Sequence, residues 1–125
     1  MSIFTCETIN ATHEFLANGK RWWIASTDAG YLAGMVSVET VGDEWAWIND
    51  LFVVEPYRRQ GVAKLLLSVL EDFASRDSSL VGVACAINRG NGPSCNLFRS
   101  RSYAHCYTYP ESGTRMYSRR FERSH

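Results

Sequence analysis

The sequence predicts a single mixed α/β domain, with antiparallel strands at both ends of the chain and a parallel β-α-β unit between them. Three observations support this prediction. β-branched and aromatic residues are dense in the first half, apolar residues recur at helical spacing after residue 61, and an almost wholly apolar run follows at residues 80–87. A chain of 125 residues has the usual size of one domain, so residues 1–125 are expected to share one core.

The first half is expected to form a short helix and then an antiparallel meander. Residues 12–16 carry helix-compatible side chains, and Ala17-Asn18-Gly19-Lys20 matches a helix end with Asn or Gly at the cap. Runs rich in β-branched and aromatic residues then predict strands at residues 21–26, 31–41 and 45–54. Asp and Gly occupy both connections between these strands, which favours tight turns.

The middle of the chain changes to helical periodicity. A helix is predicted from residue 61 to about residue 75, because apolar residues share one helical face: Val62, Leu65, Leu66, Val69, Leu70 and Phe73. Residues 80–87 have the apolar character of a strand that is buried on both faces. Residues 45–87 are therefore expected to be a β-α-β unit with parallel strands.

The last third is expected to hold a second helix and a closing hairpin. Pro93 suits the first turn of a helix, because its ring fixes a helical φ and its missing N–H has no partner there. This helix is expected to reach about Arg101. Strand-like runs at residues 103–109 and 114–121 follow, parted by Pro110-Glu111-Ser112-Gly113, which has strong turn chemistry.

The charge balance disfavours several kinds of partner. Lys plus Arg and Asp plus Glu number 13 each, so the chain has no overall field that attracts nucleic acid or an anionic membrane. A nucleic-acid-binding module remains an alternative only through the arginines at the C-terminal end, which a solvated final strand explains more simply: Arg115, Arg119, Arg120 and Arg123. The polar N-terminus and the lack of an 18-residue apolar run predict a soluble, cytoplasmic protein.

Cysteine and histidine spacing predicts neither a disulfide framework nor a metal site. The four cysteines contain no C-x-x-C pair. The three histidines, His13, His105 and His125, lie far apart and have no cysteine or carboxylate at a ligand spacing.

The segment between the central strand and the first long helix has the chemistry of an anion-binding loop. Gly61 and Ala63 let a ligand approach the backbone closely, and a helix N-terminus offers free amides and a partial positive charge. Arg58, Arg59 and Lys64 add positive side chains, so a pyrophosphate is the expected kind of ligand. Neither a P-loop nor a dinucleotide-binding glycine fingerprint is present.

Two blocks of sequence resemble the GNAT acetyltransferases. Leu51-Phe52-Val53 followed by Tyr57-Arg58-Arg59-Gln60-Gly61-Val62-Ala63 resembles the family's acetyl-coenzyme A motif, which also lies between a strand and a helix. Asn91-Gly92-Pro93-Ser94-Cys95-Asn96-Leu97-Phe98, followed by Ser102-Tyr103, resembles a second family block, most closely that of spermidine/spermine acetyltransferases. The likeness covers residues 31–121 and implies the GNAT acyltransferase fold, with an N-terminus shorter than usual.

The resemblance implies acetyl-coenzyme A as cosubstrate, in a cleft where two central parallel strands part. Its pantetheine arm would pair with the backbone of residues 51–53, and Asn91 would bond an amide or carbonyl of that arm. Cys95 shares a helical face with Phe98 near the expected thiol, without forming a covalent intermediate. The implied binding residues are Leu51, Phe52, Val53, Arg58, Arg59, Gln60, Gly61, Val62, Ala63, Lys64, Asn91, Ser94, Cys95 and Phe98.

Two positions depart from the family's catalytic pattern. Many relatives have a tyrosine general acid at the position of Phe98, whose ring has no ionisable proton. Relatives with a carboxylate base on the central strand place it at the position of Asn49, and a neutral amide cannot accept a proton near neutral pH. The resemblance therefore implies acetyl transfer without identifying the acid or the base.

Several nearby residues are candidates for those roles. Asp50 is adjacent to Asn49, but strand alternation turns it to the opposite face unless a bulge intervenes, so a structural hydrogen bond is the favoured role. Glu39, Glu44 and Asp43 are candidate bases through a bridging water. Tyr103 and Tyr107 are candidate acids, although Tyr103 also fills a structural aromatic position of the family. The candidate catalytic set is Asn49, Asp50, Glu44 and Tyr103.

The function expected from this pattern is transfer of acetyl from acetyl-coenzyme A to a primary amine, by direct attack in a ternary complex. The acceptor is either a small molecule or a peptide amine, and a homodimer is common in the family. Loss of an acid or base lowers a rate by only about 10²- to 10⁴-fold, so positioning alone can sustain turnover. The alternative is a non-catalytic sensor or interaction module that binds acyl-coenzyme A.

Overall fold

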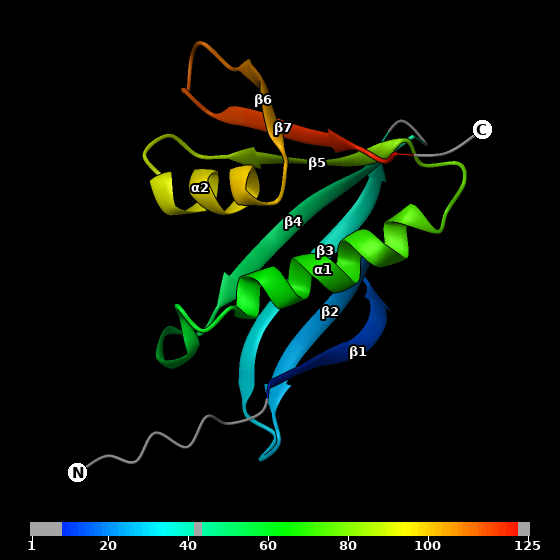
Figure 1. The fold of residues 1–125 in the computed structure, drawn as a ribbon, viewed down its shortest axis with the longest axis vertical. Helices are drawn as coiled ribbons and strands as arrows, with labels where there is room; N and C mark the ends of the chain where they lie inside the picture. The colour runs from blue at the N-terminus through cyan, green and yellow to red at the C-terminus, as the bar shows by residue number, and fades with distance from the viewer. Residues whose placement is uncertain (1–8, 42–43, 123–125) are drawn as a thin grey trace.

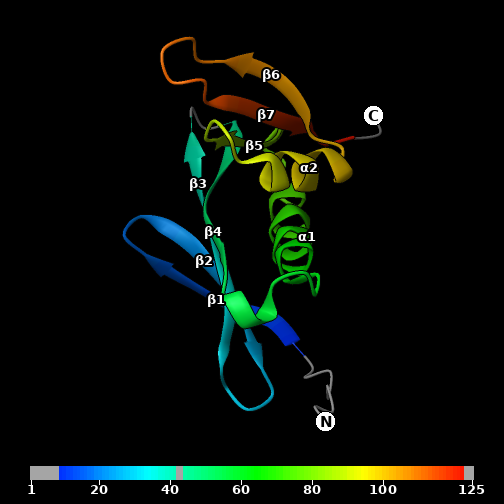
Figure 2. The ribbon, with the colours of Figure 1, turned by 90° about the vertical axis from the view of Figure 1, so that its left-hand side faces the viewer.

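The computed structural model describes residues 9–41 and 44–122. They form one mixed seven-stranded sheet of order β1-β2-β3-β4-β5-β7-β6, with both helices on the same side of its central strands (Figures 1 and 2). No helix within these ranges is long and apolar enough to cross a membrane. The elements are β1 (Ile9–Ala17), β2 (Lys20–Thr27), β3 (Leu32–Val41), β4 (Trp45–Val53), the 3₁₀ helix η1 (Glu55–Tyr57), α1 (Val62–Ser75), β5 (Gly82–Ile87), α2 (Gly92–Ser100), β6 (Ala104–Thr108) and β7 (Arg115–Arg120).

The segment before β2 is a strand, so the prediction of a helix at residues 12–16 is wrong. β1 pairs antiparallel with β2, and Asn18 and Gly19 connect them with φ values of 55° and 74°. Two positive φ values suit the type I′ hairpin turn that Asn-Gly favours, and the same dipeptide also resembles a helix cap. Phe15 stacks on Trp22 across the pair, with ring centroids 6.4 Å apart. Such cross-strand contacts stabilise the strand over a helix in this segment.

The remaining expected elements are confirmed with shifts of one or two residues at their ends. Helix α1 covers the face of the sheet that carries Trp23, which packs edge-on against Phe73 at 5.3 Å between ring centroids. A glycine on β3 permits this close approach. A Cβ on Gly34 would lie 2.7 Å from the carbonyl oxygen of Phe52 and 3.0 Å from Cγ1 of Val62. The first turn of α1 is thereby seated directly over the central strands.

The parallel pair in the middle of the sheet separates before its strands end. β4 and β5 pair in register from Trp45 and Gly82 as far as Ile48 and Cys85, and no further. Beyond that point β4 keeps β3 as its partner and β5 keeps β7. The two strands diverge visibly in Figure 1, and the wedge between them lies beside the N-terminal end of α1.

A bulge on β4 coincides with this separation. Ser37 faces Asn49 and Met35 faces Phe52, so β4 has one more residue than β3 between these two pairs. Asp50 lies within the bulge and has a φ of 56°. Because a bulge bends its strand and increases the local twist, it directs β4 away from β5.

The last two strands form the expected hairpin. Their order in the sheet is not the order in the sequence, and local sequence patterns do not reveal this. β7 lies between β5 and β6 and is antiparallel to both. Tyr117 on β7 is fully buried, whereas every residue of β6 is exposed. β6 is thus an edge strand, held mainly through its pairing with β7.

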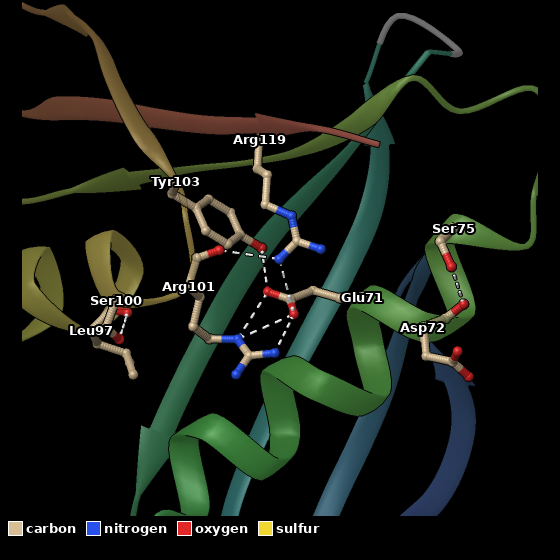
Figure 3. A network of polar contacts seen from close by, with 8 residues as sticks. All are labelled: Glu71, Asp72, Ser75, Leu97, Ser100, Arg101, Tyr103 and Arg119. Atoms are coloured by element: carbon tan, nitrogen blue, oxygen red, sulfur yellow. Dashed lines mark hydrogen bonds and ion pairs between the residues drawn. The ribbon is translucent and has the colours of Figure 1, made fainter. Parts of the chain in front are cut away.

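A buried carboxylate ties α1 to the segment that follows α2 (Figure 3). Glu71 on α1 accepts hydrogen bonds from Nη2 of Arg101 at 2.5 Å and from the hydroxyl of Tyr103 at 2.9 Å. Nη1 of Arg119 lies 3.4 Å from the same carboxylate and donates to the carbonyl oxygen of Arg101. These contacts fix the C-terminal hairpin against α1 and so hold one wall of the wedge.

Candidate functional site

The separated strands enclose a cleft of about 510 Å³. β4 supplies one wall and β5 the other, while the loop before α1 and helix α2 close the cleft further. Its lining residues are Ile48, Asn49, Asp50, Leu51, Val53, Arg58, Ala63, Cys85, Ala86, Ile87, Asn88, Asn91, Pro93, Ser94, Leu97 and Phe98. Half of the residues that the sequence marked for a ligand are therefore brought together here, seven of the fourteen.

Backbone groups of β4 face this cleft without a strand partner on that side. Pairing with β5 stops at Ile48, while pairing with β3 continues to Val53. An extended strand alternates its N–H and C=O groups between its two edges, so residues 49–53 present groups to the wedge. Nε of Arg58 takes one of them, the carbonyl oxygen of Val53, at 3.0 Å. An extended ligand with amide groups can occupy the others as an added strand would.

The predicted anion loop borders a second groove, of about 690 Å³, that continues from the cleft. The two cavities share Leu51, Val53, Arg58 and Ala63, together with residues of α2. The groove adds five further candidates to the site: Phe52, Arg59, Gly61, Val62 and Lys64. Cleft and groove form one continuous depression that runs from the wedge to the start of α1.

Gly61 is the N-cap of α1 and has a φ of 79°, which glycine adopts without strain. No side chain caps this end of the helix, and a Cβ on Gly61 would meet nothing within 4 Å. The first amides of a helix have no intrahelical partner and carry partial positive charge. The loop is therefore open toward the groove and suited to an anion.

Helix α2 forms the wall opposite the loop. Asn91 is its N-cap, and the side-chain oxygen accepts from the backbone N–H of Ser94 at 3.2 Å. This capping bond was not expected from the sequence, and it leaves the side-chain NH₂ group to act on a ligand. Phe98 is buried at the inner end and packs edge-on against Tyr103, with ring centroids 5.0 Å apart.

The bulge places both Asn49 and Asp50 on the cleft, so the expectation that they face opposite sides is wrong. Asp50 makes a hydrogen bond of the kind favoured for it, since Ser37 Oγ donates to its carboxylate at 2.6 Å, and Lys20 Nζ lies 3.2 Å away. The Ser37 hydrogen bond, supported by Lys20, holds the pKa of Asp50 below its ordinary value. Asn49 donates from Nδ2 to Oε1 of Glu39 at 2.8 Å.

Six described candidate residues lie outside the lining of both cavities, and Asp43 lies outside the described residues. Of the six, Glu39 is hydrogen-bonded to the lining residue Asn49, and Tyr107 is exposed on β6. Tyr103 is buried against Glu71, and Glu44 is exposed at the far end of β4, where its carbonyl accepts from Val81. Gln60 turns back to donate to the carbonyl oxygen of Pro56. Cys95 is buried and faces a separate hollow behind α2. The folded positions of these residues follow from helix and strand orientation, which the motifs alone do not define.

Cys85 is a lining residue that the sequence did not single out. It stands where the strands part, and burial raises the pKa of its thiol to about 12. A thiol that keeps its proton is a poor nucleophile, so Cys85 is a poor candidate for a covalent intermediate. In the described ranges, no group of three His, Cys, Asp or Glu residues is placed to hold a metal ion.

Comparison with known proteins agrees with this geometry. The model of the "Acetyltransferase (GNAT) family" matches residues 4–103 of this chain. A search of curated proteins gives no significant match.

Solved structures share the fold at low sequence identity. Arabidopsis thaliana NAA60 in complex with a bisubstrate analogue has a TM-score of 0.70 at 20% identity, covering 83% of this chain and 76% of that one. A GNAT family acetyltransferase from Staphylococcus aureus gives 0.72 at 14%, covering 83% and 69%. RimL, a ribosomal L7/L12 alpha-N-protein acetyltransferase in complex with coenzyme A, gives 0.72 at 15%, covering 81% and 62%. The same Arabidopsis protein also superimposes in its acetyl-CoA complex, with a TM-score of 0.71 at 19% identity, covering 83% and 77%.

Proposed function

Because the chain belongs to the acetyltransferase (GNAT) family, we propose that it transfers acetyl from acetyl-coenzyme A to a primary amine, by direct attack within a ternary complex. One observation carries the proposal: the unpaired edge of β4 leads directly to the open, positive N-terminus of α1. A strand edge binds the amides of an extended pantetheine arm, and a helix N-terminus binds a pyrophosphate. The two features lie along one depression in the order that this cosubstrate requires.

The residues have distinct tasks in this proposal. Backbone groups of residues 49–53 hold the pantetheine arm and orient the thioester, and Asn91 adds its side-chain NH₂ group. Gly61 leaves room for the phosphates, while Arg58 and Lys64 add positive charge at the groove. Phe98 closes the inner end with an apolar surface and supplies no proton. Catalysis then rests on positioning and on backbone hydrogen bonds to the carbonyl oxygen.

We propose a primary amine as acceptor, on a small molecule or a peptide, because solved neighbours include a complex with a bisubstrate analogue and an alpha-N-protein acetyltransferase. A cytoplasmic location and a homodimer are further proposals that rest on the sequence resemblance.

The test is acetyl-coenzyme A turnover, followed as thiol release at pH 7 to 9. The panel contains spermidine, benzylamine and a tripeptide with a free N-terminus, and calorimetry measures acetyl-coenzyme A binding alongside. Thiol release that requires an amine supports the proposal, with the acetylated product identified by mass spectrometry. Binding without release for every amine would favour the acyl-coenzyme A sensor instead. Absence of binding would overturn the assignment of the cleft.

A further inference from the structure

The cleft also opens onto the sheet face that lies away from the helices. Trp23 packs under α1, so its neighbour Trp22 faces the other way. Register places Trp22 beside Ser37 and Ser37 beside Asn49, so all three share that outer face. Asn49 nevertheless lines the cleft. Figure 2 shows α1 and α2 on the opposite side of the central strands. If acetyl-coenzyme A occupies the helix side, the outer face is open to the acceptor.

Two carboxylates lie near this outer opening of the cleft (the outer mouth), and their surroundings differ: Asp50 lines the cleft, and Glu39 is hydrogen-bonded to the lining residue Asn49. Asp50 already accepts from Ser37 and pairs with Lys20, which keep it ionised and make it a poor proton acceptor. Glu39 is bound by Asn49 through one oxygen and forms no ion pair within the described part of the chain. Glu39 is only partly buried, so its remaining acceptor sites are accessible from the outer face.

The hydrogen bond between Asn49 and Glu39 joins the cleft to a carboxylate on the next strand. Glu39 faces Trp47 in register and lies diagonally from Asn49 on the same face. Asn49 thus lines the cleft and fixes Glu39 through its side-chain NH₂ group. A carboxylate in this place can reach a cationic group that enters the outer mouth, where Coulomb attraction favours a monocation over a neutral molecule.

We propose that Glu39 binds and deprotonates the ammonium group of a cationic primary amine acceptor, and that Asn49 is its positioning residue. This inference rests on the proposed acetyltransferase function. One proton passes from the ammonium group to the Glu39 carboxylate and then to solvent. The neutral amine forms a C–N bond with the acetyl carbon, the C–S bond breaks, and the thiolate takes the second proton from the nitrogen. The products are the acetamide and the free thiol of coenzyme A.

The test compares the wild type with four variants, using whichever panel amine the wild type acetylates: Glu39→Gln, Asp72→Asn, the double variant Glu39→Gln/Asn49→Asp, and Asp50→Asn. Glu39→Gln keeps an oxygen that accepts from Asn49, so the fold and the acetyl-coenzyme A affinity are expected to stay unchanged. Asp72→Asn removes a charge from the exposed face of α1 and is the control. We expect kcat for Glu39→Gln to fall by about 10²-fold at pH 7. Its pH profile should move upward, toward the pKa of the free amine. The double variant Glu39→Gln/Asn49→Asp returns a carboxylate to the mouth and should restore part of the rate.

Each outcome decides a different claim. A Glu39→Gln protein with the wild-type rate and pH profile would overturn the role of Glu39. A loss of rate with an unchanged pH profile would reduce Glu39 to a structural support and also overturn it. Wild-type protein that binds acetyl-coenzyme A but acetylates no panel amine would overturn the inference together with the proposed transfer. A full loss in Asp50→Asn with none in Glu39→Gln would give the role to Asp50.

Discussion

The hydroxyl of Tyr103 donates a 2.9 Å hydrogen bond to Oε2 of Glu71, which lies 32 positions earlier in the chain. Burial, reinforced by the negative Glu71 carboxylate, raises the pKa of Tyr103 far above its ordinary value. The phenol therefore keeps its proton at any physiological pH. Tyr103 is a structural donor at the joint between α1 and the C-terminal hairpin, which accounts for its distance from the cleft.

Removing the carboxylate at this joint should destabilise the fold. Glu71→Ala leaves Arg101 and Arg119 without their buried partner, and we expect the free energy of unfolding to fall by about 3 kcal/mol. Tyr103→Phe loses one hydrogen bond to a charged group and should cost about 1.5 kcal/mol. Urea denaturation measures both values. Asp72→Ala, which breaks an exposed pair with Arg76, is the control and should cost under about 1 kcal/mol.

Charge at the N-cap of α1 should decide acetyl-coenzyme A binding. Asn and Asp both tolerate the positive φ of Gly61 and have nearly the same size, so Gly61→Asn and Gly61→Asp differ chiefly by one negative charge. We expect the Asp variant to bind acetyl-coenzyme A about 10- to 100-fold more weakly than the Asn variant, a difference of about 1.4 to 2.7 kcal/mol. Calorimetry at low salt measures the two dissociation constants. Equal affinities would place the pyrophosphate elsewhere.

The Asp50 carboxylate should contribute stability only above acidic pH. Its pKa is lowered in the folded protein, chiefly by the Ser37 hydrogen bond, so the stabilisation is present above the unfolded-state value near 3.8. It is lost as pH falls through the lower folded-state value. Compared with Asp50→Asn, the wild type should be more stable by under about 1 kcal/mol at pH 7, and this advantage should shrink as the pH falls below 3.8. Thermal unfolding across this range checks the sign, and a gap that widens in acid would contradict it.

Restoring a phenol at the inner end of the cleft should raise turnover. Phe98 lines the cleft and packs its ring against Tyr103, so Phe98→Tyr adds a hydroxyl with little change in shape. We expect kcat to rise by about 10-fold, a fraction of what a well-placed general acid contributes. Phe98→Leu preserves an apolar end without a proton and serves as the comparison. A lower rate in Phe98→Tyr would show that the apolar surface itself is required.

Local pattern predicted most of the elements because apolar spacing and turn residues act within a few positions. The stripe from Val62 to Phe73 became α1, and the Asn91 block became the start of α2. The error at residues 12–16 has a clear origin. Asn18-Gly19 suits both a helix end and a hairpin turn, and the partner that decides, β2, comes later in the chain. Short ambiguous segments take their structure from what they pack against.

The sequence by itself determined the family pattern, the anion loop around Gly61 and the loss of the usual acid and base at Phe98 and Asn49. The tertiary structure alone decided which side chains meet at the cleft. The bulge at Asp50 brought two adjacent residues to one wall, and strand pairing set Glu39 beside Asn49, ten positions away. Register and bulges depend on contacts between strands, and no residue pattern within one strand specifies them.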